Sequence, residues 1–251
     1  MRLLWRLAAV ATATSFFADL SCSGASALVG ASTEPEPREI AQTILVTAIK
    51  GRGGSFCTGV VLAPDAVLTA GHCAYGASAI AVNAARAGAQ PQLIEAATHV
   101  MHPEFRHNAA ARRERSIDLA LLRLSEPLPA SFAPAQLTER SSTEVGEAFL
   151  ILGFGLTREG VESSAGRLRA GELQTRAPLS RILLWARDPL EKGFGACTGD
   201  SGGPILSADG AVFAITSWST GAGKQSCGAL TQAALVGPQR QWITKTIASW
   251  R

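Results

Sequence analysis

The chain has 251 residues with a formal net charge of +3, and 47% of its residues are hydrophobic against 17% charged. This composition excludes an intrinsically disordered chain. The small net charge argues against nucleic acid as the partner, because nucleic-acid binding needs a clustered basic face. The length permits one large all-β domain or two smaller ones. The 25 glycines and 12 prolines are spread along the chain, as is typical of many short strands joined by turns.

The N-terminus has the pattern of an export signal. Arg2 and Arg6 precede an apolar stretch over residues 7–18, and small side chains follow at residues 25–27. The alternative is an N-terminal membrane anchor, but the stretch is shorter than the ~20 residues that a membrane-spanning helix needs. We therefore expect a signal peptide over residues 1–27 and a secreted or periplasmic protein with no membrane association.

Cysteine usage agrees with export. Of the five cysteines, removal of the signal peptide takes away Cys22. The four that remain are Cys57, Cys73, Cys197 and Cys227. An even number in an exported chain favours disulfides over buried free thiols. Four cysteines allow three pairings, and their spacing alone does not choose among them.

The first half of the chain begins with two predicted strands. Residues 40–50 are rich in β-branched side chains, a glycine-rich turn follows, and residues 56–62 are again apolar. A third apolar stretch over residues 66–69 leads into His72. A histidine beside an apolar stretch is more often structural than catalytic, so His72 needs further support before it is assigned as a base.

Residues 77–111 are alanine-rich and weakly patterned. They contain His99, His102 and His107, whose irregular spacing is not that of a helical metal site. We therefore expect structural or surface histidines and no metal. The basic run that follows and ends at Arg115 is expected to be a solvated loop rather than a docking patch.

Residues 117–124 are almost all apolar, which is typical of a strand buried on both faces. Asp118 lies at the start of this stretch, and a buried carboxylate without a partner is strongly unfavourable. We expect that partner to be His72. Asp65 is the alternative carboxylate for His72, but it lies in a predicted turn and is expected to be exposed.

Residues 127–146 are the predicted linker between the two halves of the chain. Beyond it, strands are predicted at residues 148–155, 173–177, 182–186, 204–206 and 212–218. Asp209-Gly210, between the last two strands, is a hairpin signal. Residues 239–250 place Trp242, Ile243 and Trp250 on one helical face. This pattern predicts a C-terminal helix whose aromatic side chains belong to the core.

The most distinctive segment is Gly-Asp-Ser-Gly-Gly-Pro at residues 199–204. Successive N–H groups in a glycine-rich turn can converge on one point and hold negative charge. If Ser201 is a nucleophile, the N–H groups of Gly199 and Ser201 would stabilise the oxyanion that forms. A serine needs an adjacent base, and His72 is the candidate. The alternative is an ordinary glycine-serine surface loop.

Three motifs carry a family resemblance. Thr-Ala-Gly-His-Cys at residues 69–73, Ser-Ile-Asp-Leu-Ala at residues 116–120 and the segment at residues 199–204 occur in this order. Together they resemble the chymotrypsin/trypsin family of serine endopeptidases over the chain from residue 28 onward. The resemblance implies an all-β fold of two antiparallel six-stranded barrels, over about residues 28–130 and 146–237, and a C-terminal helix. It also implies a monomer that acts on proteins or peptides without cofactor or metal.

The resemblance also implies residue roles. Ser201 would attack the peptide carbonyl, His72 would take its proton, and Asp118 would orient His72. Cys57 would pair with Cys73, and Cys197 with Cys227. Residues 28–31 resemble the start of mature proteases of this family, in which the freed α-ammonium pairs with the aspartate before the nucleophile, here Asp200. A single signal cleavage after Ala27 would create that terminus.

The resemblance places a pocket for the side chain before the scissile bond (P1). Its residues would be Gly195 and Ala196 at the base, Ser217, Trp218 and Ser219 along one wall, and Gly228 opposite. Trypsin-like enzymes have an aspartate where this chain has Gly195, so we expect an apolar P1 side chain of small to medium size. Ser219 stands where the family has glycine, and the segment 220–226 is longer than usual.

These observations predict a secreted serine endopeptidase. The alternative from another class is a non-catalytic binding protein on the same fold, although all three triad residues are present. An esterase is a further alternative. Its Gly-x-Ser-x-Gly motif lies between a strand and a helix, whereas Ser201 is followed by Pro204 and a predicted strand.

Overall fold

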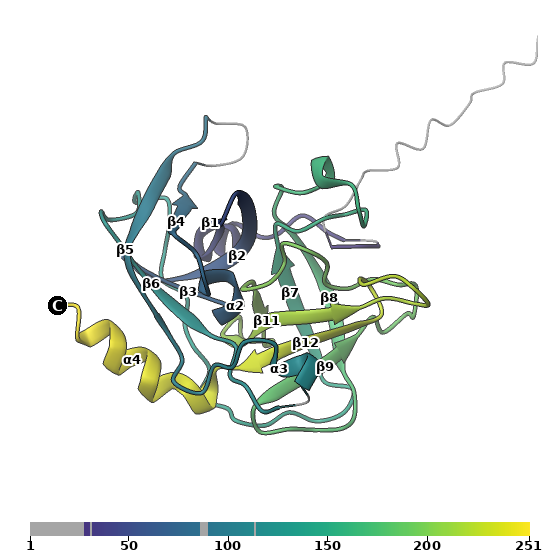
Figure 1. Cartoon of the computed structure of the whole chain (residues 1–251). Coiled ribbons are helices and arrows are strands. Elements are labelled where there is room, and N and C mark those ends of the chain that lie inside the picture. Colours follow the sequence, from purple (N-terminus) through teal and green to yellow (C-terminus); the bar gives the residue numbers. More distant parts are fainter. Residues whose placement is uncertain (1–27, 31, 86–89, 113) are drawn as a thin grey trace, which may run out of the picture.

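The computed structural model describes residues 28–30, 32–85, 90–112 and 114–251, so the predicted signal peptide lies outside the described residues. The chain forms two closed barrels, each of six antiparallel strands, with a few short helices around them (Figure 1). This architecture confirms the predicted fold class. Among the described residues, no helix is both long and apolar enough to cross a membrane.

The first barrel closes in the order β1-β2-β3-β6-β5-β4. Its strands are β1 (Thr43–Lys50), β2 (Gly53–Ala63), β3 (Ala66–Thr69), β4 (Ala79–Asn83), β5 (Leu93–Met101) and β6 (Ala120–Leu124). Apolar side chains such as Ile44, Val82 and Leu122 fill its interior. The region 77–111, in which no strand was predicted, contains β4 and β5. Most residues of β5 are at least partly exposed, so hydrophobic alternation is weak there.

The first strand begins later than predicted. Residues 40–42 belong to a short helix, α1 (Pro37–Gln42), and β1 starts at Thr43. Pro37 stands at the first helical position, where its missing N–H is no loss. The carboxylate of Glu39 accepts a hydrogen bond from the backbone N–H of Glu36 at 2.8 Å, which caps the helix.

The second barrel closes in the order β10-β11-β12-β9-β8-β7. Its strands are β7 (Ala148–Gly153), β8 (Arg169–Thr175), β9 (Leu183–Arg187), β10 (Pro204–Leu206), β11 (Val212–Thr220) and β12 (Leu230–Leu235). The prediction missed β12 and placed the start of β8 four residues late, at residue 173 instead of Arg169. Residues 125–147, which connect the barrels, contain no named strand.

The two barrels share an apolar interface. Leu68 and Leu121 of the first barrel belong to one buried cluster with Leu152 and Ile215 of the second. Helix α4 (Arg240–Ala248) adds the buried side chain of Ile243 to the same cluster, and the aromatic Trp242 and Trp250 pack against it while partly buried. Figure 1 shows α4 leaving the second barrel and running beside the first.

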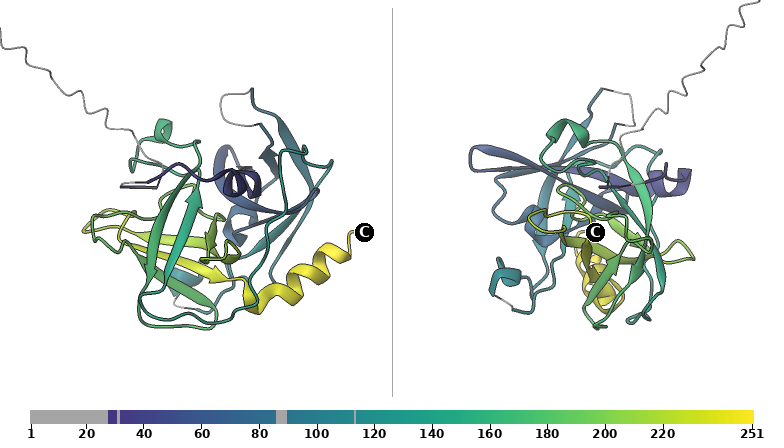
Figure 2. Two further views of the ribbon diagram at one scale, coloured as in Figure 1. Left: turned by 180° about the vertical axis from the view of Figure 1, so that it is seen from behind. Right: turned by 90° about the vertical axis from the view of Figure 1, so that its right-hand side faces the viewer.

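The N-terminal segment also connects the barrels. Val29 and Thr33 form isolated bridges with Gly195 and Ala170 of the second half, whereas α1 contacts β1 and β2 of the first barrel (Figure 2). The remaining elements are short. They are α2 (Gly71–Ala74), α3 (Ala109–Arg112) and two 3-10 helices, η1 (Glu162–Ser164) and η2 (Gly237–Gln239).

Candidate active site

The structure brings His72 and Asp118 together. His72 lies in the single turn of α2, which follows β3, and the Cys57–Cys73 disulfide ties this turn to β2. The imidazole Nδ1 is 2.7 Å from Asp118 Oδ2, and the backbone N–H of His72 donates to Asp118 Oδ1 at 2.8 Å. One carboxylate therefore fixes both the backbone and the ring of the histidine.

A serine from the second barrel completes the surroundings of Asp118. Ser217 Oγ donates a hydrogen bond to Asp118 Oδ2 at 2.5 Å. Burial raises the pKa of Asp118, but the hydrogen bonds from His72 and Ser217 outweigh it and bring the pKa below its usual value. Asp118 is therefore a carboxylate, able to stabilise a protonated imidazole. Sequence reasoning placed Ser217 in the pocket wall and missed this contact.

Lys50 is a second neighbour that sequence reasoning missed. It is the last residue of β1, and its Nζ donates to the backbone carbonyl of His72 at 2.5 Å. Burial lowers the pKa of Lys50, and the nearby Asp118 carboxylate partly opposes this. Nothing in the local sequence distinguishes Lys50 from an ordinary lysine at a strand end.

The loop that carries Ser201 is docked on β2 of the first barrel. The Thr58 N–H donates to the Ser201 carbonyl at 2.8 Å, and the Thr58 hydroxyl donates to the Gly199 carbonyl at 2.9 Å. Gly199 has φ +97°, and a Cβ at this position would lie 2.0 Å from the ring of Phe56. Only glycine fits this turn.

Two backbone N–H groups of this loop are free. The N–H groups of Asp200, Gly202 and Gly203 donate to the carbonyls of Cys197, Thr216 and Asp200, respectively. By contrast, neither Gly199 nor Ser201 donates its N–H to any residue that the structure describes. These are the two groups predicted to form the oxyanion site, and an unpaired pair of N–H groups can hold an oxyanion.

His72 and Ser201 share Cys73 as a neighbour. The Sγ atom of Cys73 lies 3.8 Å from His72 Nε2 and 3.8 Å from the Ser201 carbonyl oxygen. The free ring nitrogen of the histidine and the Ser201 loop therefore both lie next to the same sulfur atom. Within the described residues no hydrogen bond joins the Ser201 hydroxyl to His72. Bonds between nucleophile and base are often long in the absence of substrate and shorten when it binds.

Asp200 is fully buried behind the loop. Its Oδ1 accepts from the Gly155 N–H and its Oδ2 from the Cys197 N–H, both at 2.8 Å. A Cβ at Gly153 would lie 1.9 Å from the Asp200 carboxylate, so the side chain fills a space that only glycine leaves open. Burial raises the pKa of Asp200 to about 7 although both N–H groups oppose this. Among the described residues, no cationic side chain forms an ion pair with it.

The predicted base of the P1 pocket is closed by backbone. Gly195 and Ala196 are buried, and the Gly228 N–H donates to the Ala196 carbonyl at 3.3 Å. A Cβ at Gly195 would lie 3.2 Å from Gly228 Cα and 3.3 Å from the hydroxyl of Thr231. Thr231, which sequence reasoning missed, accepts the Ala196 N–H at 3.1 Å. The predicted pocket base therefore carries no carboxylate, and a side chain at position 195 would press against Gly228 and Thr231.

Comparison with known proteins identifies the family. The trypsin family model matches residues 34–243. The chain belongs to the trypsin family of serine proteases. Trypsin from Sus scrofa is 29% identical over 215 residues, covering 78% of this chain and 87% of that protein. Trypsin from Saccharopolyspora erythraea is 27% identical over 193 residues, covering 70% of this chain and 81% of that protein.

Solved structures show the same fold. Mouse neuropsin, a serine protease, superposes with a TM-score of 0.69 at 24% sequence identity, covering 86% of this chain and 98% of that chain. With the family shown by sequence, this trypsin-family protein is a serine endopeptidase. Its family acts on protein or peptide substrates.

The predicted wall of the P1 pocket in this protease is held by a folded loop. Trp218 is 45% exposed, between Ser217 and Ser219. The Ser219 hydroxyl donates to the Ser226 carbonyl at 2.9 Å, and the Ser226 N–H donates to Glu159 at 2.8 Å. The long segment between β11 and β12 is therefore tied back to the loop after β7. The Cys197–Cys227 disulfide joins this segment to the nucleophile loop.

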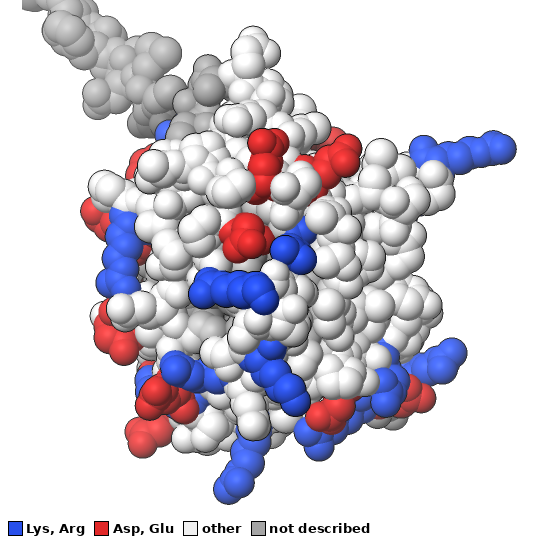
Figure 3. Space-filling model, turned by 90° about the vertical axis from the view of Figure 1, so that its left-hand side faces the viewer, with Lys and Arg blue, Asp and Glu red and all other residues white. Residues whose placement is uncertain are grey.

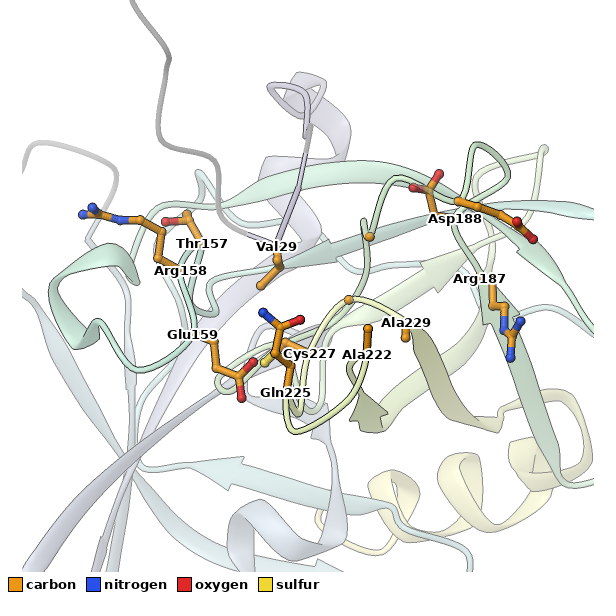
Figure 4. A pocket seen from close by; sticks show the side chains of 13 residues that line it. Val29, Thr157, Arg158, Glu159, Arg187, Asp188, Ala222, Gln225, Cys227 and Ala229 are labelled. Atoms are coloured by element: carbon orange, nitrogen blue, oxygen red, sulfur yellow. The ribbon is translucent and has the colours of Figure 1, made fainter.

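Two cavities of the protease lie near this wall. One, of about 380 Å³, is lined by His72, Asp118, Ser217 and Trp218, among others. The other, of about 570 Å³, adjoins Gly228, and Figure 4 shows Val29, Gln225 and Cys227 around it. His72 and Asp118 line the first cavity and not the second, whereas Ser201 is among the lining residues of neither.

Two of the other histidines of the protease pack against aromatic side chains. His102 is buried and packs edge-on against Trp242, and His107 stacks on Tyr75 with 4.4 Å between ring centroids. In the described part of the chain, the one cluster of metal-binding residue types is Cys57, His72 and Cys73. Its two sulfurs are joined in a disulfide, so the imidazole alone is free to ligate.

Charges of both signs are mixed on the surface. Arg115, at the end of the predicted basic run, pairs with Glu104 at 3.3 Å. On the face that carries the first barrel, Lys and Arg side chains alternate with Asp and Glu and do not gather into one basic patch (Figure 3).

Proposed function

We propose that this protein is an exported endopeptidase in which Ser201 is the nucleophile, His72 the general base and Asp118 the group that orients the base. The observation that carries the proposal is the 2.7 Å bond between His72 Nδ1 and Asp118, because it leaves Nε2 to take a proton on the side of the Ser201 loop. The free N–H groups of Gly199 and Ser201 support it.

The reaction follows from this arrangement. The Ser201 oxygen attacks the carbonyl carbon of the scissile bond while its proton moves to His72 Nε2, and Asp118 stabilises the resulting imidazolium. The carbonyl oxygen becomes an oxyanion held by the two free N–H groups, each worth about 100–1,000-fold in rate. His72 then gives the proton to the leaving amine, and the C–N bond breaks. Water, deprotonated by His72, attacks the acyl-enzyme and releases the acid.

For the P1 side chain, we infer a preference for apolar groups of small to medium size. Gly195 offers no carboxylate to a Lys or Arg side chain, and burial of an unpaired cation is strongly unfavourable. The close contacts that a Cβ at Gly195 would make with Gly228 and Thr231 support a limit on the size of that side chain. A peptide-library cleavage profile tests this, and a preference for Lys or Arg would contradict it.

Export and activation belong to the same proposal. Two disulfides favour an oxidising compartment outside the cytosol. A signal cleavage before Leu28 would free an α-ammonium, which we expect to pair with the buried carboxylate of Asp200. Leu28 is already fully buried, in one apolar cluster with Phe194 and Ala196 of the chain that leads to Asp200. N-terminal sequencing of the active secreted protein tests the position of the cut.

The nucleophile is tested by covalent labelling. A fluorophosphonate probe should label the mature protein, and Ser201→Ala should abolish both labelling and peptide hydrolysis. Ser141→Ala is the matched control, because Ser141 is exposed and should leave both unchanged. Absence of labelling in a folded, correctly cleaved protein would favour the alternative, a non-catalytic binding protein on the same fold.

A further inference from the structure

The cavity beside His72 continues across three strands of the second barrel. We call it the inner cleft, defined by His72, Trp218, Gln232 and Leu183 among its lining residues. Trp218 in β11 is paired with Gln232 in β12, and Gln232 is paired with Trp185 in β9. Directly paired residues on antiparallel strands point to the same face of a sheet. Trp218, Gln232 and Trp185 therefore form a row on the outside of the barrel that leads away from the triad.

The row ends in a second groove. This outer groove, of about 430 Å³, is lined by Val145, Pro178, Trp185, Leu230, Arg176 and Arg187. Val145 is 59% exposed and the neighbouring Leu179 is 50% exposed, so apolar surface is open to solvent here. Trp185 of the outer groove and Gln232 of the inner cleft are adjacent, so the two surfaces are continuous.

The outer groove carries positive charge that is available to a ligand. Arg187 forms no ion pair or side-chain hydrogen bond with any described residue, and in Figure 4 its guanidinium points in the opposite direction from the carboxylate of Asp188. Within the described part of the chain, Arg176 pairs only with Glu191, at 3.9 Å, and both side chains are largely exposed. Exposed pairs of this kind are weak, so Arg176 can exchange Glu191 for a carboxylate on a ligand.

We propose that the outer groove binds the part of the substrate well before the scissile bond, and that it selects apolar side chains next to acidic ones. This inference rests on the proposed function of the triad. Because Trp218 belongs to the wall of the predicted P1 pocket, the part of the substrate that covers Trp218 is the part before the scissile bond. Adjacent strands are ~4.8 Å apart and an extended peptide advances ~3.3 Å per residue, so a substrate over Trp218 reaches Trp185 within about three further residues.

The loop of the first barrel makes this route a channel. Residues 105–109 and 114–116 line the inner cleft together with Leu183 and Gln232. Figure 1 shows α3, which belongs to this loop, in front of β9 and β12. A substrate that leaves the triad along β11 is therefore guided over β12 toward β9.

Three fluorogenic peptides test the proposal by their kcat/KM values. They share an alanine-rich P4–P1 segment with valine at P1, and two of them are extended at P8–P5 by alternating Leu and Glu or by alternating Leu and Lys. The acidic extension should raise kcat/KM about tenfold over the tetrapeptide through added apolar and ionic contacts, and the basic extension should not. Arg187→Glu should reverse the order of the two extended peptides. Lys245→Glu, an exposed control with the same change in charge, should preserve it.

Binding is measured separately from turnover. On the Ser201→Ala background, fluorescence anisotropy of the labelled Leu-Glu peptide should give a Kd that Arg187→Glu weakens about tenfold and Lys245→Glu does not change. Equal binding by both variants, or equal kcat/KM for all three peptides, would overturn the outer-groove proposal while leaving the triad intact. Binding that depends on Arg187, without hydrolysis by the wild type, would support the groove and contradict the proposed function. The outer-groove proposal would also be overturned if the protein self-associates through this groove and the peptide does not displace the second copy.

Discussion

Lys50 and His72 lie on different elements of the first barrel, yet the lysine ammonium donates a hydrogen bond to the histidine backbone carbonyl at 2.5 Å. This contact holds the turn of α2 in addition to the Cys57–Cys73 disulfide, and it places a cation near Asp118. Lys50 is therefore a positioning residue for the proposed base.

Lys50→Met should lower kcat/KM about tenfold, which corresponds to ~1.4 kcal/mol of transition-state stabilisation. The carbonyl of His72 loses its partner, and Asp118 loses a nearby positive charge. Lys50→Arg keeps a cationic donor and should restore most of the activity, and the exposed Arg52→Met should have no effect. If Met and Arg at position 50 behave alike, Lys50 does not position the histidine.

Ser217→Ala should narrow the pH range of activity on the acid side. Ser217 is one of the donors that lower the pKa of Asp118, so its removal raises this pKa toward the usual value. A carboxylate with a lowered pKa contributes stability above its unfolded pKa and loses it as the pH falls through the folded value.

In the Ser217→Ala variant this loss is smaller and is complete at a higher pH, because the folded pKa of Asp118 lies closer to the unfolded one. The free energy of unfolding at pH 7, measured by urea titration, should fall by about 1.5–3 kcal/mol, the range for a hydrogen bond to a charged group. Ser217→Thr retains the hydroxyl, so its free energy of unfolding should lie between those of the wild type and Ser217→Ala. An unchanged acid limb of kcat/KM in Ser217→Ala would show that the bond to Asp118 has no catalytic consequence.

Asp200 should make the uncleaved chain less stable as the pH rises. Its pKa is about 7 in the folded state, whereas an aspartate in an unfolded chain titrates near pH 4. Between these values the folded chain binds a proton that the unfolded chain does not. The protonated Asp200 therefore contributes fully to the free energy of unfolding below about pH 4, and this contribution is lost by about pH 7. The loss is on the order of 4 kcal/mol.

Urea unfolding at pH 4.5 and pH 8 measures this contribution on the Ser201→Ala background, which prevents self-digestion. In Asp200→Asn the free energy of unfolding should no longer fall between the two pH values. In the exposed control Glu126→Gln it should fall as in the parent. In a chain that begins at Leu28 the free energy of unfolding should rise with pH instead, because a free α-ammonium beside Asp200 lowers the pKa of Asp200. The same slope with and without the preceding residues would contradict the proposed activation.

Gly195→Ala should destabilise the protein by about 1–3 kcal/mol, the usual range for overpacking a filled site. The added Cβ would contact Gly228 and Thr231 at 3.2–3.3 Å. The variant should also shift P1 preference toward alanine and away from valine and leucine. Gly54→Ala is the control, because nothing lies within 4 Å of a Cβ at that position. A thermal unfolding midpoint for Gly195→Ala equal to that of the control would show that the pocket base has spare room.

Local sequence determined the parts of this protein whose geometry depends on a few adjacent residues. The nucleophile loop was recognisable because Gly199 must adopt φ +97° and the following residues must make a tight turn, which few side chains permit. The apolar run after Asp118 indicated a buried strand whose carboxylate needs a partner. Even the predicted helix at the C-terminus depends only on the spacing of its apolar residues, and α4 spans Arg240–Ala248 within that range.

Tertiary structure decided the contacts between residues far apart in the chain. Ser217 meets Asp118, Lys50 meets His72 and Thr231 meets Ala196 only after both barrels close. The row from Trp218 to Trp185 depends on strand register, including β12, which no local signal identified. Register is set by which faces the barrels bury together, and this is a property of the whole packed core rather than of any one segment.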